Sequence, residues 1–177
     1  MKLISTLIAT LLLGLSISQI KLDGEKSKLT VTGTSSLHDW EMDVNEFKVS
    51  GDISESKVSN LLVEVTSESL KSGKSTMDKK AHDAVQSKDY PFIKFSASTL
   101  SMSNGQIQGP GTLEIGGEKR DMNFKAEIVN ETSSEMQLKG ALSLKLTDFN
   151  IDPPTALFAT LKTGDEVQVN YEIYLLK

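Results

Sequence analysis

Cysteine is absent from this 177-residue chain. Its absence excludes disulfide bonds, a thiolate nucleophile, a cysteine-ligated zinc site and a lipid-modified N-terminal cysteine. Basic residues are not in excess either, because 19 lysines and arginines stand against 24 aspartates and glutamates and give a formal charge of −5. Such a balance lacks the positive surface that binds a phosphate backbone. We therefore expect a fold stabilised by its apolar core and no nucleic-acid partner.

Histidine is also scarce, with only His38 and His82 in the chain. A metal site formed by His38, Asp39 and His82 has no supporting short-range ligand spacing. Ser35, Ser36 and His38 lie close in sequence, but no nucleophile-elbow motif accompanies them. A hydrolase or metalloenzyme centred on His38 is therefore the minor alternative. The main prediction is a binding protein without catalytic residues, metal site or cofactor.

An apolar run occupies the N-terminus, where Lys2 precedes the nearly uninterrupted apolar segment from Leu3 to Ile17. The run falls short of the roughly 20 residues that span a bilayer, and small residues follow it. A signal peptide over residues 1–18 is therefore favoured over a membrane anchor, with cleavage after Ser18. The expected result is a single domain over residues 19–177, exported to the periplasm or secreted and not membrane-spanning.

Apolar and polar residues alternate through most of residues 19–177. Alternation with period two is typical of strands that have one buried face and one solvent face. It indicates an all-β protein. The predicted strands are Leu29–Gly33, Glu41–Val44, Phe47–Asp52, Leu61–Ser67, Phe92–Leu100, Gln106–Ile115, Met122–Ile128, Met136–Leu146 and Val167–Leu175.

Glycine-containing pairs and triplets mark the expected turns between strands, at Asn104-Gly105, Gly116-Gly117 and Thr163-Gly164-Asp165. Gly109-Pro110-Gly111 lies inside a predicted strand and indicates a bulge or sharp bend. Helical spacing interrupts the strand pattern once, over Thr76–Gln86, where Thr76 is the predicted N-cap.

The strand pattern fits both a two-sheet sandwich and a barrel. Long strands joined by tight turns favour an eight-stranded antiparallel barrel, because closure removes exposed strand edges. The inward face carries Leu, Val, Ile, Met and a few aromatic residues with almost no charge. That composition fits either a packed core or an apolar tunnel for a ligand.

Four segments resemble the YceI-like family: Ser87–Ser96, Gly109–Phe124, Thr147–Ala156 and Gly164–Val169. They are similar to its yP-x-I-x-F-x-S strand, its G-x-L-t-i-x-G-x-x-r hairpin and its closing D-f-x-I…DeVxI segment, in the same order. The resemblance implies an extended lipocalin-like barrel with one short helix, exported to the periplasm. It also implies a hollow lumen that binds a polyisoprenoid or a similar long-chain lipid.

The expected ligand is thus a polyisoprenoid, an isoprenoid quinone or a fatty acid, held by a carrier or sequestering protein. The segment Ser67–Gln86 departs from the family's S-I-x-T…R-D-x-H-L wording. The alternative function is a filled barrel that acts as an interaction module through its surface. The oligomeric state stays open, with a homodimer as one option. The inward-facing residues predicted to bind the ligand are Phe95, Leu113, Ile115, Phe124, Leu142, Leu144, Val169 and Tyr171.

Overall fold

The computed structural model describes residues 17–156 and 161–176. In this part of the chain, 13 strands form one sheet in which every ladder is antiparallel. The strands are β1 (Ser18–Gln19), β2 (Lys21–Leu22), β3 (Lys28–Ser35), β4 (Trp40–Val44), β5 (Phe47–Ile53), β6 (Lys57–Thr66), β7 (Leu70–Lys71), β8 (Phe92–Ser103), β9 (Gln106–Ile115), β10 (Glu118–Glu131), β11 (Glu135–Lys145), β12 (Thr155–Ala156) and β13 (Leu161–Leu176). One α-helix, α1 (Ser75–Ala84), and two short 3₁₀ helices, η1 (Ser67–Ser69) and η2 (Leu146–Phe149), complete the described elements.

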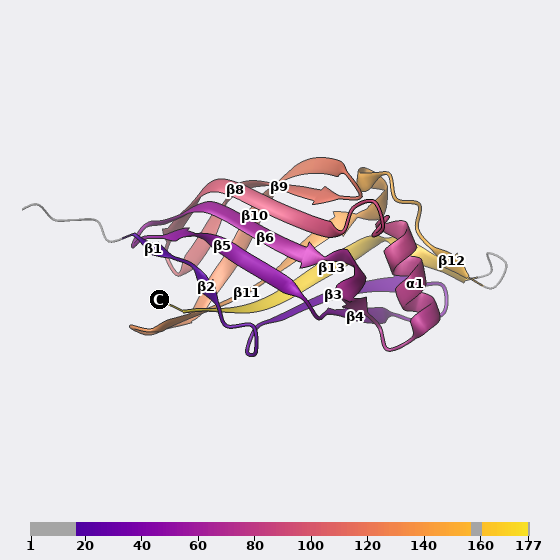
Figure 1. Cartoon of the computed structure of the whole chain (residues 1–177), viewed down its shortest axis with the longest axis horizontal. Coiled ribbons are helices and arrows are strands. Elements are labelled where there is room, and N and C mark those ends of the chain that lie inside the picture. Colours follow the sequence, from indigo (N-terminus) through magenta and orange to yellow (C-terminus); the bar gives the residue numbers. More distant parts are fainter. Residues whose placement is uncertain (1–16, 157–160, 177) are drawn as a thin grey trace, which may run out of the picture.

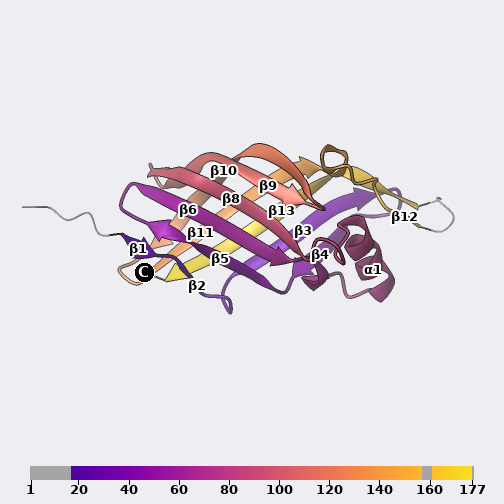
Figure 2. The ribbon, with the colours of Figure 1, turned by 45° about the horizontal axis from the view of Figure 1, so that its top comes forward.

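The sheet curls around its long axis into a half-barrel, so the lipocalin-like prediction is confirmed and the two-sheet sandwich is excluded (Figures 1 and 2). The strand order is β1-β5-β6-β8-β9-β10-β11-β13-β3-β4-β7. No ladder joins β4 to β5 within the described residues. At the end away from the helix, the N-terminal segment bridges the two sides of the sheet, because β1 pairs with β5 and β2 pairs with β13. The predicted count of eight strands is too low. Four of the additional strands, β1, β2, β7 and β12, have only two residues and cannot display alternation.

Two of the three predicted turns are confirmed. Asn104 and Gly105 join β8 to β9, and Gly116 and Gly117 join β9 to β10, all four with the positive φ that tight hairpins require. The turn predicted at Thr163-Gly164-Asp165 is wrong, because this segment continues β13. There the β13–β3 register shifts between Thr163 and Val167. Glycine accommodates such an irregularity as readily as a turn, and its presence alone does not distinguish the two.

The bend predicted at Gly109–Gly111 is confirmed by a register shift in the β8–β9 ladder. Pairing is regular from Lys94 to Ser96, resumes at Ser101, and skips the residues opposite this segment. Gly109 has a φ of 156°. The bend increases the local curvature of the sheet, as bulges do in barrels.

Helix α1 spans Ser75–Ala84, close to the predicted range, but Thr76 is not its N-cap. Lys74 occupies that position without a side-chain capping bond. The preceding turn is held instead by Asp78, whose Oδ1 accepts hydrogen bonds from Ser72 Oγ at 2.6 Å and Ser72 N at 2.7 Å. These bonds lower the pKa of the Asp78 carboxyl. The helix crosses one end of the half-barrel, beside β4 and β12 (Figures 1 and 2).

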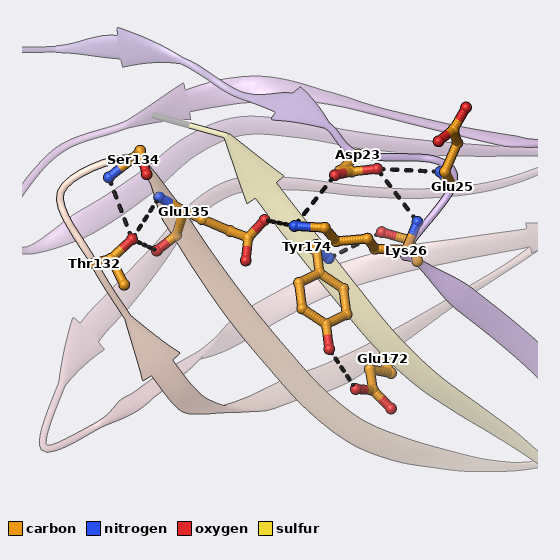
Figure 3. A network of polar contacts seen from close by, with 9 residues as sticks. Asp23, Glu25, Lys26, Thr132, Ser134, Glu135, Glu172 and Tyr174 are labelled. Atoms are coloured by element: carbon orange, nitrogen blue, oxygen red, sulfur yellow. Dashed lines mark hydrogen bonds and ion pairs between the residues drawn. The ribbon is translucent and has the colours of Figure 1, made fainter.

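At the end of the half-barrel opposite to α1, polar side chains form a network of contacts at the surface (Figure 3). Lys26 Nζ lies 2.5 Å from Glu135 Oε2 and 3.8 Å from Asp23 Oδ2. The hydrogen bond to Glu135 raises the pKa of Lys26. Tyr174 Oη donates to Glu172 Oε1 at 2.9 Å. Tyr174 N also donates to Ser27 Oγ at 2.9 Å. The turn before β3 is thus connected to the β10–β11 hairpin by Lys26 and to β13 by Ser27, but the exposed ion pairs contribute little stability.

Candidate functional site

A cavity of about 640 Å³ lies on the concave side of the sheet. Its volume falls within the range of roughly 300–1,000 Å³ typical of small-molecule sites. Most side chains that line it are aliphatic or aromatic. The structure brings all eight residues of the sequence prediction onto this lining: Phe95, Leu113, Ile115, Phe124, Leu142, Leu144, Val169 and Tyr171.

Strand parity explains this convergence. Along β11, Met136, Leu138 and Leu144 are buried, whereas Lys139 and Ser143 are exposed. Because alternate side chains point to opposite faces, one buried residue assigns the face of its neighbours along a regular part of a strand. The same rule operates on β9, β10 and β13, and on β8 as far as Ala97, and these strands supply the other predicted residues. Beyond Ala97 the register shift changes the phase of β8, and Leu100 is buried. Whether the eight side chains bind a ligand stays a prediction.

Three aromatic rings form a row across the cavity wall, from β8 through β10 to β13. The ring centroids of Phe95 and Phe124 are 5.4 Å apart, and those of Phe124 and Tyr171 are 5.7 Å apart. Tyr171 Oη donates a hydrogen bond to the Lys125 carbonyl oxygen at 2.5 Å. The hydroxyl is therefore satisfied by the wall, and the tyrosine presents its ring to the lumen.

Inward-facing glycines let these rings lie flat against the sheet, a feature that the sequence reasoning missed. A Cβ at Gly140 would come within 2.5 Å of Tyr171 Cζ, and one at Gly111 within 2.6 Å of Phe95 Cε2. Gly140 is the direct cross-strand partner of Tyr171. Pairing an aromatic ring with a glycine covers the exposed backbone. A glycine in the inward phase of an alternating strand was the available sequence signal.

Burial raises the pKa of Tyr171 from 10.0 to about 12. The pKa of Tyr171 is higher in the folded state than in the unfolded state. The buried tyrosine therefore contributes fully to the free energy of unfolding below about pH 10, and this contribution is lost as the pH rises towards 12. We expect Tyr171→Phe to remove this alkaline loss, while costing about 1 kcal/mol at neutral pH through the missing hydrogen bond. Urea unfolding at several pH values between neutrality and pH 12 measures both effects. An unchanged alkaline loss in Tyr171→Phe would contradict the assignment.

The α1 end of the cavity contains residues that sequence reasoning did not assign to the site. Met77 and Ala81 of helix α1 and its C-cap residue Val85 line the lumen. Basic side chains also line this end: Lys74, Lys80, Lys162 and His38. They come from the helix, from the start of β13 and from the β3–β4 loop, so no local sequence motif could connect them.

The two histidines do not converge. His38 Nδ1 lies 2.7 Å from the Asp39 carbonyl oxygen, and His82 Nε2 lies 3.0 Å from that of Leu70. Among the described residues, no group of three or more His, Asp or Glu side chains could hold a metal ion. In the same ranges, no helix has the length and apolar character needed to cross a membrane.

A family model of the YceI-like domain matches residues 20–175. A search of curated proteins gives no match. Among solved structures, BcnA of Burkholderia cenocepacia is 18% identical, with a TM-score of 0.74 over 87% of this chain and 99% of its own. A polyisoprenoid binding domain from Saccharophagus degradans, implicated in plant cell wall breakdown, is 13% identical, with a TM-score of 0.67 over 91% and 99%. The YceI protein of Campylobacter jejuni is 19% identical, with a TM-score of 0.57 over 100% and 91%.

Proposed function

Because this chain belongs to the YceI-like family, we propose that it binds a long-chain lipid in its cavity and acts as a carrier or sequestering protein. The observation that carries the proposal is the apolar cavity of about 640 Å³ inside the half-barrel. A cavity of this size that stayed dry would forfeit contacts along its whole lining, whereas an apolar chain would regain them. The Saccharophagus domain, which shares the fold, is described as polyisoprenoid-binding and supports this ligand class.

The lining favours binding over catalysis. Its side chains supply hydrophobic contact along the lumen, and the one hydroxyl in the aromatic row, that of Tyr171, is engaged by a backbone carbonyl. Burial of an apolar chain gains about 25 cal/mol for each Å² removed from water, without any directional group. A polyisoprenoid, an isoprenoid quinone and a fatty acid all fit this chemistry. We therefore propose a binding protein and not an enzyme.

Mass spectrometry of lipid extracted from the purified protein tests the ligand class. We expect a long-chain lipid to co-purify in near-stoichiometric amount and to be absent from a mock preparation. If no lipid co-purifies and none binds when added, the protein is an interaction module that acts through its surface.

Leu144→Trp separates a hollow lumen from a filled one. Leu144 is buried on the cavity lining, and a larger side chain there would occupy space that the lipid needs. We expect a folded variant with a Tm close to that of the parent and with no bound lipid. In a filled barrel the same change would overpack the core at a cost of about 1 to 3 kcal/mol. Strong destabilisation together with a lipid-free parent would therefore contradict the proposal.

We also propose export to the periplasm after removal of residues 1–18, on the basis of the apolar run from Leu3 to Ile17. Most of the predicted signal peptide lies outside the described residues. Ile20 is the first buried residue in the described range, so cleavage after Ser18 would spare the core. N-terminal sequencing of periplasmic material should begin at Gln19. Material that still begins at Met1 would contradict this proposal.

A further inference from the structure

The α1 end of the cavity has a charge opposite to that of the whole chain. Lys74, Lys80 and Lys162 line this end, with His38 beside them. No aspartate or glutamate within the described ranges lines the cavity, although acidic residues outnumber basic ones by 24 to 19 in the sequence. Basic side chains at the rim of a low-dielectric cavity create a local positive potential there.

Hydrogen bonds join the three elements that carry these side chains. Lys80 Nζ donates to the Thr155 carbonyl oxygen at 2.5 Å. Thr155 in turn pairs with Lys162 in the β12–β13 ladder. Lys162 N donates to Ser36 Oγ at 3.1 Å, and Ser36 N donates to the Lys162 carbonyl oxygen at 2.9 Å. The helix, the start of β13 and the β3–β4 loop therefore form one connected rim.

The positive charges of this rim are not neutralised by described carboxylates. Lys26, Lys28 and Lys139 form ion pairs elsewhere on the sheet, but none of the three rim lysines has a described carboxylate within 4.0 Å. Two acidic side chains on the same elements, Asp78 and Asp165, are engaged by other groups. Asp78 accepts from Ser72, as described above, and Asp165 accepts from Thr147 N at 2.9 Å and Oγ1 at 2.7 Å.

We propose that the lipid carries an anionic head group, of the phosphate or carboxylate class, bound at this rim by Lys74, Lys80 and Lys162. The inference rests on the proposed function and assigns the ligand its orientation. The hydrocarbon chain extends into the lumen past the aromatic row, and the head group lies at the α1 end. Lysine ammonium groups bind phosphate as point charges, so three of them around one opening suit an anion without a fixed bonding geometry.

The fluorescence of the single tryptophan of the chain, Trp40, reports ligand binding. Trp40 lines the cavity, so its fluorescence should change when a chain enters. Geranylgeranyl phosphate and geranylgeraniol serve as probes of the delipidated full-length protein, because they share a hydrocarbon chain and differ in head-group charge. The test variant is Lys74→Gln/Lys80→Gln/Lys162→Gln. The matched control is Lys48→Gln/Lys57→Gln/Lys125→Gln, which removes three exposed lysines outside the cavity lining.

The parent and the control should bind the phosphate about tenfold more tightly than the alcohol, a difference of about 1.4 kcal/mol. The test variant should bind the two probes with nearly equal affinity. Adding salt to about 0.5 M should reduce the ratio in the parent, since screening weakens exposed ion pairs. A ratio near one in the parent, or an undiminished ratio in the test variant, would overturn the anionic assignment while leaving the proposed function intact. Failure of the parent to bind either probe would overturn both.

Discussion

Leu144→Glu should abolish lipid retention and lower the free energy of unfolding by about 3 kcal/mol or more. Leu144 is 8% exposed and lies in the hydrophobic core cluster that lines the cavity. The lysines of this stretch of β11, Lys139 and Lys145, are exposed on the solvent face. The inward residues are Leu138, Gly140, Leu142 and Leu144, none of which carries a charge. An ionised carboxylate there would lose its hydration without gaining a partner. Chemical denaturation and lipid extraction measure the two effects separately.

Ser143→Glu is the matched control, because it adds the same charge one residue away on the opposite face. Ser143 is exposed, and its cross-strand partner is the neutral Gln168. We expect a stability within about 0.5 kcal/mol of the parent and normal lipid content. Equal losses in the two variants would show that strand parity does not separate lumen from solvent here.

The same parity explains how far sequence reasoning could reach. Each strand of the cavity wall has one face in solvent, so apolar and polar residues alternate along it. The inward residues could therefore be predicted without knowing the strand order. Phe95 on β8 and Tyr171 on β13 are far apart in sequence, yet Phe124 lies between their rings. The direction of a side chain is a local property, whereas the neighbours that it meets depend on strand order.

The basic rim at the α1 end could not be predicted in this way, because its residues come together only through the strand order and the course of the loops. Lys80 and Thr155 meet only where α1 crosses the end of the half-barrel. Two-residue strands such as β12 are specified by their partner strand and carry no pattern of their own. The Thr76 prediction failed for a related reason. Hydrogen bonds from Ser72 to Asp78 hold the turn before the helix, and the helix begins without a side-chain cap.

Gly140→Ala should destabilise the protein by about 2 to 3 kcal/mol, a large effect for one methyl group. Ladder pairing between β10 and β11 extends only as far as Glu127 and Lys139, so the two strands separate at Gly140. Tyr171 crosses this fork, with its ring over Gly140 and its hydroxyl bonded to the Lys125 carbonyl oxygen. A Cβ would lie within 2.6 Å of Tyr171 Cε2. The ring would have to move into the lumen and give up its hydrogen bond.

A double-mutant cycle with Tyr171→Leu tests whether the ring is the cause. Without the ring, the new methyl group meets a shorter, flexible side chain, and alanine restricts the unfolded chain more than glycine does. The cost of Gly140→Ala should therefore fall below about 1 kcal/mol in the Tyr171→Leu background. Denaturant unfolding of the four proteins gives the coupling energy. Additive costs would mean that Gly140 is required by the backbone at the fork and that Tyr171 could lie flat over an alanine. Strong coupling would mean that this glycine keeps the aromatic ring out of the lumen, where we propose that the lipid binds.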